Sequence, residues 1–428
     1  MKKKVLIVTY YWSPAGGSGV QRWVKFAKYL PCFDIEPIIY TPENPTYPIL
    51  DSSMEQEIPK DLTVIKQPIW EPYNLANRFS KKNQDYNAGF YDHHSKQNWK
   101  TKLSLFIRGN FFIPDARKFW IKPSVRFLKS YIQQEQIDTF ITTGPPHSMH
   151  LIGLRLKNQF PHLKWIADFR DPWTNVYYYP SLKLTRWANR KHKRLEQRVL
   201  NTADFIISVT SDYQLLYQNK TSKPVYCLTN GFDTLESSLF HSLDSRFSIA
   251  YIGAMFKERN PQILWKVLNK LSSENKTFAY DLSIKLIGKF DDSILKDIHT
   301  HRLEKNLDFK GYLSHKEALI EQQRSQILLL VTANQDDKKG NIPGKLFEYI
   351  SSKRPIIAFG PKESQIEKIL NQTQTGKYFL FDDEDALEAY ILYLYQQFKT
   401  NNLTIHSKNI NQFHRKNITE ELSRIIKN

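Results

Sequence analysis

Residues 340–360 read Gly340-Asn-Ile-Pro-Gly-Lys-Leu-Phe-Glu-Tyr-Ile-Ser-Ser-Lys-Arg-Pro-Ile-Ile-Ala-Phe-Gly360. An apolar run at Ile327–Val331 precedes this segment and another, Ile356–Phe359, ends it. The pattern predicts strand, loop, short helix and strand, with Lys345 and Glu348 on one helix face. Free N–H groups at such a helix start favour an anion, Lys345 adds positive charge, and Glu348 is suited to accept hydrogen bonds from sugar hydroxyls. The residue types alone leave an ordinary surface helix with a Lys/Glu pair as the alternative.

The run Pro343-Gly-Lys-Leu-Phe-Glu-Tyr349, followed by Lys353-Arg-Pro-Ile-Ile-Ala358, resembles a known motif. It is similar to the nucleotide-sugar motif in the C-terminal domain of GT-B-fold glycosyltransferases of family GT4, the bacterial group 1 glycosyltransferases. The resemblance implies that Lys345, Leu346 and Glu348 bind the donor, with Glu348 on the nucleotide ribose. The family often has a second glutamate, with seven residues between the two, and this position is Gly340 here.

The length and composition indicate a globular, two-domain protein. A chain of 428 residues exceeds one typical core, and 41% hydrophobic residues suffice for packed domains. Two cysteines provide neither a disulfide framework nor a zinc site, which suits a reducing cytoplasm. The apolar start, Val5–Tyr10, is short and precedes Ser13-Pro14, so we expect a first strand there rather than a signal peptide. No apolar run approaches the ~18–20 residues that span a bilayer.

The formal net charge of +18 makes nucleic acid, an anionic membrane surface and a phosphorylated substrate candidate partners, with solvated lysines of a generally basic proteome as the alternative. No helix-turn-helix, zinc-finger or RNA-recognition signature favours nucleic acid. The basic, aromatic segment Trp99–Trp120 is a candidate for a membrane surface or an acceptor groove, and the basic helix predicted at Leu184–Val199 is a candidate for a lipid headgroup contact. Ordinary packed helices with a solvated charged face are the alternative. We therefore expect a cytoplasmic protein, with peripheral contact on the inner face of the cell membrane as a further hypothesis.

A βαβ unit is predicted at the start, from a strand at Val5–Tyr10, a helix at Gln21–Leu30 and a strand at Glu36–Thr41. The intervening glycines fit neither the dinucleotide fingerprint nor a P-loop. The loop Pro14-Ala-Gly-Gly-Ser-Gly-Val-Gln-Arg22 resembles the Gly-Gly loop that, in GT-B enzymes, faces the interdomain cleft near the donor diphosphate. The resemblance makes Gly16 and Gly17 donor-binding residues, whereas a plain tight turn is the alternative.

Two motifs follow strands of the first domain. The strand Asp138–Thr143 ends in Gly144-Pro-Pro-His-Ser148, and the strand Trp165–Phe169 ends in Arg170-Asp-Pro-Trp173. Ligands of open parallel sheets bind just past such strand ends. The motifs resemble those of a bacterial subgroup of these transferases, but a histidine in many relatives is Arg170 here. We therefore rank Arg170 and Asp171 as catalytic above His147 and His150, and assign Gly144, His147 and Asp171 to the acceptor side.

Strands of the second domain are also predicted at Leu282–Ile287, Leu307–Lys310 and Tyr378–Phe381. The domain begins with the strand Phe247–Ile252 and Gly253. Relatives carry an arginine directly after this glycine and a lysine six residues after it, both on the donor phosphates. Here the two positions are Ala254 and Arg259, and Lys257 is a second cation in the loop. The resemblance thus adds Gly253, Lys257 and Arg259 to the donor site. The acidic run Asp382–Asp385 opens a helix and is expected to cap it, so we expect no metal site there.

These observations predict an α/β protein of the GT-B fold, with two Rossmann-like domains facing each other across a cleft. Residues 1–235 form the acceptor domain, residues 246–400 form the nucleotide-sugar domain, polar residues 234–246 act as a hinge, and the tail 401–428 packs back on the first domain.

The expected activity is transfer of a sugar from a UDP- or GDP-linked donor to a glycan or lipid-linked acceptor in cell-envelope or exopolysaccharide synthesis. The resemblance implies a retaining reaction. We expect no cofactor and no metal, because Arg259, Lys345, the helix N-termini and the Gly16-Gly17 amides can stabilise the leaving diphosphate. The expected catalytic residues are Arg170, Asp171, Arg259 and Lys345. Two alternatives remain. One is a nucleotide-sugar 2-epimerase on the same fold, and the other is a non-catalytic basic protein that binds nucleic acid or membrane.

Overall fold

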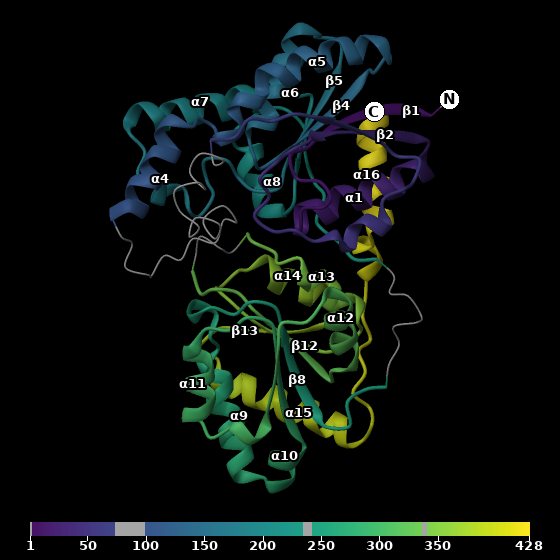
Figure 1. Cartoon of the computed structure of the whole chain (residues 1–428). Helices are drawn as coiled ribbons and strands as arrows, with labels where there is room; N and C mark the ends of the chain where they lie inside the picture. Colours follow the sequence, from purple (N-terminus) through teal and green to yellow (C-terminus); the bar gives the residue numbers. More distant parts are fainter. Residues whose placement is uncertain (1, 73–98, 234–241, 336–339) are drawn as a thin grey trace. The chain divides into compact units, whose positions relative to one another are not determined.

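The computed structural model of the chain describes residues 2–72, 99–233, 242–335 and 340–428. The chain divides into two compact units. Unit 1 comprises Met1–Asn230 and Arg415–Asn428, and unit 2 comprises Gly231–His414. Most of the predicted hinge, residues 234–241, lies outside the described residues. In each unit, helices cover both faces of a parallel sheet (Figure 1).

Unit 1 has a seven-stranded parallel sheet in the order β3-β2-β1-β4-β5-β6-β7. Its strands are β1 Lys3–Val8, β2 Ile35–Pro42, β3 Thr63–Gln67, β4 Thr139–Gly144, β5 Lys164–Phe169, β6 Phe205–Ser208 and β7 Val225–Cys227. The central strand β1 pairs with β2 on one side and β4 on the other. The strand order therefore reverses at β1, and the loops that leave β1 and β4 lie where open α/β sheets bind ligands.

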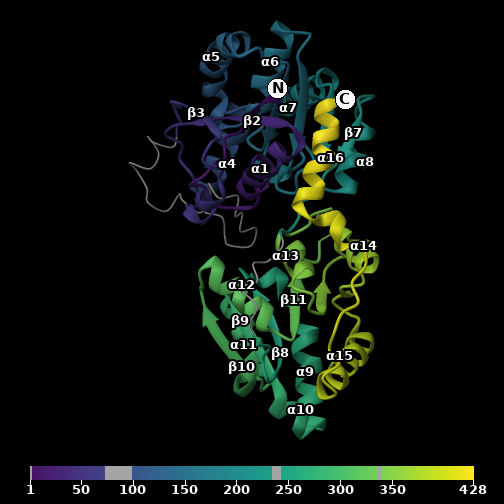
Figure 2. The ribbon, with the colours of Figure 1, turned by 90° about the vertical axis from the view of Figure 1, so that its right-hand side faces the viewer.

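Successive residues of β1 show why both faces of this sheet are covered. Leu6 and Val8 belong to a core with α5 and α6, whereas Val5 and Ile7 belong to a second core with α1 and α16. The helices of unit 1 are α1 Ser18–Tyr29, α4 Trp99–Phe111, α5 Ile121–Gln134, α6 Ser148–Gln159, α7 Arg186–Thr202, α8 Ser211–Gln218 and α16 Arg415–Lys427, with short turns η1 Leu30–Phe33, η2 Ser52–Glu57, η4 Ala116–Trp120 and η5 Tyr179–Leu182. Figure 2 shows α16 beside α1, although unit 2 separates them in the sequence.

A buried ion pair joins α1 to the sheet of unit 1. Arg22 Nη2 lies 3.0 Å from Asp168 Oδ1, and both side chains are nearly inaccessible. The Asp168 carboxylate also accepts hydrogen bonds from Trp23 Nε1 at 3.0 Å and Thr143 Oγ1 at 2.7 Å. These contacts satisfy the buried charge and fix the start of α1, which carries the glycine loop.

Unit 2 has a six-stranded parallel sheet in the order β10-β9-β8-β11-β12-β13. Its strands are β8 Phe247–Ile252, β9 Leu282–Ile287, β10 Leu307–Gly311, β11 Ile327–Val331, β12 Ile356–Phe359 and β13 Gly376–Phe379. Its helices are α9 Gln262–Glu274, α10 Lys276–Asp281, α11 Asp292–Thr300, α12 His315–Arg324, α13 Lys345–Ser351, α14 Gln365–Thr373 and α15 Glu384–Lys399. The order reverses at β8, so the ends of β8 and β11 form the edge at which open α/β sheets bind ligands, which we call the ligand-binding edge.

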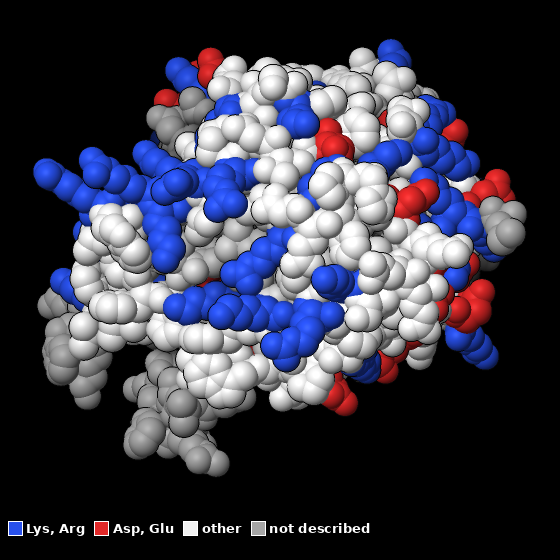
Figure 3. All heavy atoms as spheres, turned by 90° about the horizontal axis from the view of Figure 1, so that it is seen from above, with Lys and Arg blue, Asp and Glu red and all other residues white. Residues whose placement is uncertain are grey.

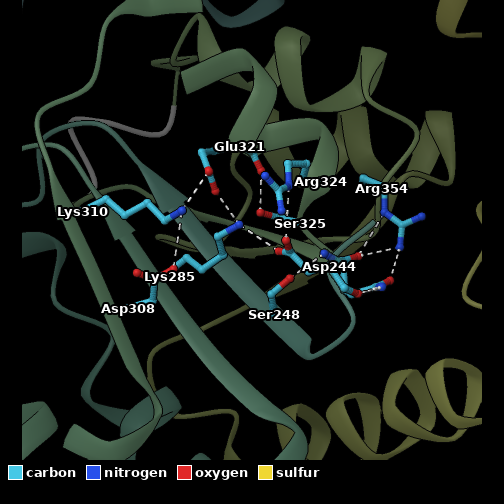
Figure 4. Close-up of polar contacts among 10 residues, drawn as sticks. Asp244, Ser248, Lys285, Asp308, Lys310, Glu321, Arg324, Ser325 and Arg354 are labelled. Carbon is cyan, nitrogen blue, oxygen red and sulfur yellow. Dashed lines mark hydrogen bonds and ion pairs between the residues drawn. The ribbon is translucent and has the colours of Figure 1, made fainter. Parts of the chain in front are cut away.

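A polar cluster under α12, which we call the Lys285 network, ties that helix to the sheet (Figure 4). Lys285 Nζ on β9 lies 2.5 Å from Glu321 of α12 and 2.8 Å from Asp244. Lys310 of β10 also bonds Glu321, at 2.8 Å. The Lys285 side chain is almost fully buried, so its charge depends on these two carboxylates.

The predicted strands at Phe247–Ile252, Leu282–Ile287, Ile327–Val331 and Ile356–Phe359 agree with β8, β9, β11 and β12. The prediction Tyr378–Phe381 for the last strand is displaced, since β13 ends at Phe379 and Phe381 packs on the core from the following loop. No helix among the described residues is long and apolar enough to cross a membrane.

Candidate functional site

The charged end of Lys345 reaches the ligand-binding edge of unit 2. Its Nζ donates a hydrogen bond to the Ile252 carbonyl oxygen at 2.7 Å, at the end of β8, and lies 4.4 Å from the centroid of the Tyr251 ring. The side chain therefore crosses from the first residue of α13 to the neighbouring strand. A fixed cation at this edge is suited to bind an anion.

Gly253 provides the space for this cation. Its φ of +127° lies in the region that favours glycine, and a Cβ there would lie 2.5 Å from Lys345 Nζ. A Cβ on Gly288, after β9, would overlap the Gly253 carbonyl oxygen. Close approach of the backbone at the ends of β8 and β9 therefore depends on both glycines, and only Gly253 was singled out from the sequence.

Three further predicted donor residues carry charges near this edge. Lys257 and Arg259 belong to the short turn after β8, Lys257 exposed and Arg259 half-buried. Glu348 lies half-buried on α13, one turn after Lys345. Within the part of the chain that the structure describes, neither the Arg259 guanidinium nor the Glu348 carboxylate has an ion-pair or side-chain hydrogen-bond partner. Both groups are therefore open to a ligand.

Leu346 differs from the other predicted donor residues. Its side chain is fully buried in a core with Phe347 and Ile350, and its N–H donates to the Pro343 carbonyl oxygen at 3.0 Å. Its side chain supports α13 from the core side. Gly340 lies in the loop between β11 and α13, and residues 336–339, which directly precede it, lie outside the described residues.

In unit 1, the predicted residues Gly16 and Gly17 precede α1, and Arg170 lies against Gly19 in its first turn. The N–H of Gly16 donates to the Ile49 carbonyl oxygen at 3.0 Å, and Gly17 precedes α1 with a φ of +107°. The Arg170 guanidinium packs against this loop, because a Cβ on Gly19 would overlap it. Arg170 Nη2 donates to the Pro145 carbonyl oxygen. The arginine thus connects the glycine loop to the Gly144-Pro145-Pro146 segment.

Burial lowers the pKa of Arg170, and the nearby carboxylates of Asp168 and Asp171 oppose this effect. Arg170 Nε is buried without a hydrogen-bond partner among the described residues. The guanidinium therefore places a poorly solvated positive charge beside the glycine loop.

A pocket of about 300 Å³ lies within unit 1, and its lining includes Tyr11 and Pro145, whose carbonyl oxygen accepts from Arg170. Its walls contain His147 and Asp171, two predicted acceptor-side residues. Aromatic rings form much of the lining, namely Tyr11, Trp173, Tyr177, Tyr178 and Tyr179, and charged side chains complete it, namely Arg108, Asp115 and Arg117. Aromatic faces combined with a few convergent polar groups are typical of small-ligand sites.

Asp171 is exposed to solvent within this pocket, and the surrounding protein atoms raise the pKa of its carboxyl above the usual value, while Arg170 lowers it. Among the described residues it has no hydrogen-bond partner. It is therefore a candidate general base.

His147 and His150 are buried around Gly144. The His147 ring stacks on Trp173 with centroids 4.8 Å apart, and a Cβ on Gly144 would lie 2.6 Å from His150 Nε2. Burial lowers the pKa of His147 well below its usual range and that of His150 to about 3. Both imidazoles are therefore neutral at pH 7. His147 lines the pocket, whereas His150 bonds Thr142 at 2.9 Å behind it.

Sequence reasoning missed residues that position the pocket wall. Trp173 Nε1 donates to His192 Nδ1 at 3.1 Å, and His192 Nε2 lies 3.3 Å from the Gly109 carbonyl oxygen. Asp115 accepts hydrogen bonds from the backbone N–H and hydroxyl of Ser148, each at 2.8 Å. These partners lie far apart in the sequence, so no local pattern could reveal them.

The acidic run Asp382–Asp385 has a structural role that differs from the prediction. Asp383 precedes α15, but its carboxylate accepts from the Leu380 N–H at 2.8 Å and does not cap the helix. Glu384 pairs with Lys266 at 2.6 Å. The expected side-chain cap is therefore wrong for Asp383. No group of three or more His, Cys, Asp or Glu residues in the described ranges could hold a metal ion.

Solved structures share this architecture along the whole chain. Sucrose-phosphate synthase from Thermosynechococcus elongatus is 13% identical with a TM-score of 0.62, covering 100% of this chain and 98% of that one. HepE from Anabaena, in complex with UDP and glucose, is 11% identical with a TM-score of 0.58 and 99% coverage of both chains. An S. aureus TarM mutant in complex with fondaparinux, alpha-GlcNAc-glycerol and UDP is 12% identical with a TM-score of 0.59, covering 100% of both chains.

The architecture of both units is that of the GT-B fold, and the family model that matches unit 2 supports a glycosyltransferase. More particularly, residues 246–397 match the family model described as glycosyl transferases group 1, so most of unit 2 is a domain of that kind. The matched range includes Gly253, Arg259, Lys345 and Glu348. A comparison of the sequence with curated proteins finds no significant match.

Proposed function

We propose that the chain is a retaining GT4-type transferase that moves a sugar from a UDP- or GDP-linked donor to a saccharide or lipid-linked acceptor. We place this transfer reaction in cell-envelope or exopolysaccharide synthesis. The observation that carries the proposal is the set of charges at the ligand-binding edge of unit 2. There Lys345 is fixed at the end of β8, with Arg259 and Glu348 in the same matched region.

The donor occupies unit 2 in this proposal. Lys345 and Arg259 bind the diphosphate, and Lys257 adds charge from the same turn. The Glu348 carboxylate accepts hydrogen bonds from two ribose hydroxyls, for which it has free lone pairs. Cations held in place before the reaction stabilise the charge that develops on the leaving diphosphate.

The acceptor occupies the pocket of unit 1. Its aromatic lining provides apolar faces for the C–H face of a sugar ring, and Asp171 provides a hydrogen-bond acceptor. Two solved relatives contain ligands of these classes, since HepE was crystallised with UDP and glucose, and TarM with UDP and alpha-GlcNAc-glycerol. Those ligands support the proposal by analogy.

In the reaction, the bond between the anomeric carbon and the donor phosphate oxygen breaks, and its electron pair leaves with the nucleoside diphosphate. The acceptor hydroxyl oxygen forms the new bond to the anomeric carbon on the same face, and its proton passes to a base. Asp171 takes this proton directly or through the leaving phosphate. Arg170 holds the glycine loop and adds positive charge beside it.

The test is a transfer assay with several UDP- and GDP-sugars, with and without a membrane extract that supplies acceptors. Sugar transfer with release of the nucleoside diphosphate supports the proposal. Conversion of the donor to its 2-epimer without transfer would assign an isomerase instead, and no turnover of any donor would favour a non-catalytic binding protein.

The first specific prediction concerns Arg259. Arg259→Ala should lower kcat by ~10²–10³-fold, as expected for losing one preorganised stabilising group, and a chelator should leave the wild-type rate unchanged. Lys296→Ala, which removes an exposed cation of α11, is the control and should retain the wild-type rate. Wild-type turnover in Arg259→Ala would remove that residue from the site, and rescue of chelated enzyme by magnesium would refute the metal-independent mechanism.

A further inference from the structure

The outer face of α4 carries an apolar stripe. Leu103, Ile107 and Phe111 follow one another at four-residue spacing and are 47%, 40% and 65% exposed. Side chains at this spacing lie on one side of a helix. Leu105, by contrast, is buried, so α4 packs through a different side. Core packing therefore does not account for the exposed stripe.

More exposed aromatic rings adjoin the end of α4. Trp70 and Phe119 are 54% and 41% exposed and pack edge to face with centroids 4.7 Å apart. Lys118 connects these rings to α4, because its Nζ donates to the Phe111 carbonyl oxygen at 2.6 Å and lies 5.0 Å from the Phe119 centroid. An exposed apolar group of this kind, edged by a cation, marks an interaction surface.

The outer face of α7 is strongly basic. Its exposed side chains include six cations, Arg186, Arg190, Lys191, Lys193, Arg194 and Arg198. Trp187, 63% exposed, lies among them, with Lys191 Nζ 4.6 Å from its ring centroid. None of the six cations has an ion-pair partner among the described residues, and the acidic residue of α7, Glu196, is buried and pairs with Lys220 at 2.9 Å. Figure 3 shows Lys and Arg side chains projecting together on the side where Figure 1 places α4 and α7.

Hydrogen bonds fix α4 and α7 to one another. The Thr185 N–H donates to Asn110 Oδ1 at 2.7 Å, and Asn110 Nδ2 donates to the Lys183 carbonyl oxygen at 3.3 Å, just before α7 begins. The contact between His192 and the Gly109 carbonyl oxygen adds a second connection. The apolar stripe and the cations therefore belong to one rigid part of unit 1, which we call the α4–α7 face.

We propose that the α4–α7 face docks on the surface of an anionic lipid bilayer. Aliphatic and aromatic side chains enter the boundary between headgroups and acyl chains, and Lys and Arg interact with anionic headgroups. Nucleic acid would account for the cations, since phosphates need only positive charge, but it gives no role to the aliphatic stripe of Leu103 and Ile107.

The docking face and the acceptor pocket share their helices. Arg108 and Gly109 of α4 and His192 of α7 line the pocket. A chain docked through this face would hold the pocket next to the lipid surface. We therefore infer that the acceptor that enters the pocket is anchored in the bilayer. This last step rests on the proposed function, whereas the docking itself does not.

The test uses the full chain and flotation with vesicles of phosphatidylcholine, alone or mixed with phosphatidylglycerol. The wild type should partition strongly onto the anionic vesicles at low salt and lose binding as salt rises. A variant with Arg190→Gln, Lys193→Gln and Arg194→Gln should bind them on the order of 100-fold more weakly, since each cation near the surface contributes about fivefold. A second variant, Ile107→Ser with Phe111→Ser, should lose at least about tenfold with no change in charge.

The matched control removes the same charge from another helix. Lys122, Arg126 and Lys129 are exposed on α5, and their replacement by Gln should change binding by less than about threefold. Equal losses in this control, equal partition onto neutral and anionic vesicles, or no partition at all would overturn the proposal. Binding to RNA that the α7 variant abolishes, without vesicle binding, would assign the face to nucleic acid. Near-UV circular dichroism checks that each variant is folded.

Activity assays separate this inference from the proposed function. The α7 variant should keep wild-type donor hydrolysis in solution and lose transfer to an acceptor embedded in anionic vesicles. Vesicle binding without any transferase activity would leave the docking face intact and refute the proposed function.

Discussion

Glu348 is the residue whose role is most directly testable, because its half-buried carboxylate faces no partner among the described residues. Glu348→Gln keeps the shape and removes the charge, so binding of a ribose diol should weaken by about 1.5–3 kcal/mol, or ~10–100-fold in Kd. Titration calorimetry with UDP and GDP measures this loss. Glu274→Gln, at the exposed end of α9, is the control. Unchanged affinity of Glu348→Gln for every nucleoside diphosphate would contradict the assignment.

The second residue-level prediction concerns pH. Asp171 acts as a base only when ionised, and the protein atoms around its carboxyl raise its pKa above the usual aspartate value, although the residue is exposed to the pocket. Turnover should therefore fall as pH decreases, with the acid limb of kcat/KM at a higher pH than for an unperturbed aspartate. Asp171→Asn should reduce the rate and remove that limb. A pH profile with the same acid limb in Asp171→Asn would show that another group titrates.

The positions of candidate residues could be predicted from the sequence where they follow a strand. Arg170 directly follows β5 and Arg259 lies in the turn after β8, whereas Lys345 begins α13 and reaches the end of β8 through its side chain. The buried pair Arg22–Asp168 was not predictable, because its members lie 146 residues apart and only the folded sheet brings them together. For Leu346, the position in the motif could be read from the sequence, but the direction of its side chain, which points into the core, could not.

Among the elements, α12 depends most clearly on one side chain, Lys285. Lys285→Met removes a buried cation and leaves the carboxylates of Asp244 and Glu321 without it. Burial alone would raise the pKa of Glu321, but bonds from Lys285 and Lys310 lower it overall, which shows that the carboxylate is ionised in this cluster. The loss of one partner from a buried pair typically costs about 3–5 kcal/mol.

Urea denaturation tests this expectation. Lys310→Met is the matched control, since Lys310 contacts the same Glu321 but its side chain is 30% exposed, and it should cost less than about 1 kcal/mol. Equal losses of unfolding free energy in the two variants would show that the burial of Lys285 does not determine how much it stabilises the fold.

Element boundaries were predictable from sequence when an apolar run ended at glycine or charged residues. β8 and β12 are examples, each followed by a glycine. β13 was displaced because Leu380 and Phe381 continue the apolar run into a loop that packs on the core. For Trp99–Trp120 the sequence allowed a membrane surface, an acceptor groove or packed helices, and the segment forms α4 and the short η4. The composition of the segment could not distinguish these alternatives, because α4 has both a packed side and an exposed apolar side.

At the scale of the whole chain, α16 completes unit 1 after the sequence has passed through unit 2. Ile418, Leu422, Ile425 and Ile426 of this helix are buried in the core that contains β1 and α1. Leu422→Ala should therefore lower the free energy of unfolding of unit 1 by about 2–5 kcal/mol. Calorimetric melting measures the effect. The control is Arg424→Ala on the exposed side of the same helix, which should cost less than about 1 kcal/mol. Equal shifts in the two variants would show that α16 contributes no specific packing.

The order of α16 in the chain also has a consequence during synthesis. A ribosome produces the strands and helices of unit 1, then the whole of Gly231–His414, and only afterwards α16. At about 5–20 residues per second, the intervening segment takes roughly 10–40 s to translate. For that time the apolar groove beside α1 is open in the nascent polypeptide, so chaperones that bind exposed hydrophobic surface should capture unit 1 until its last helix emerges.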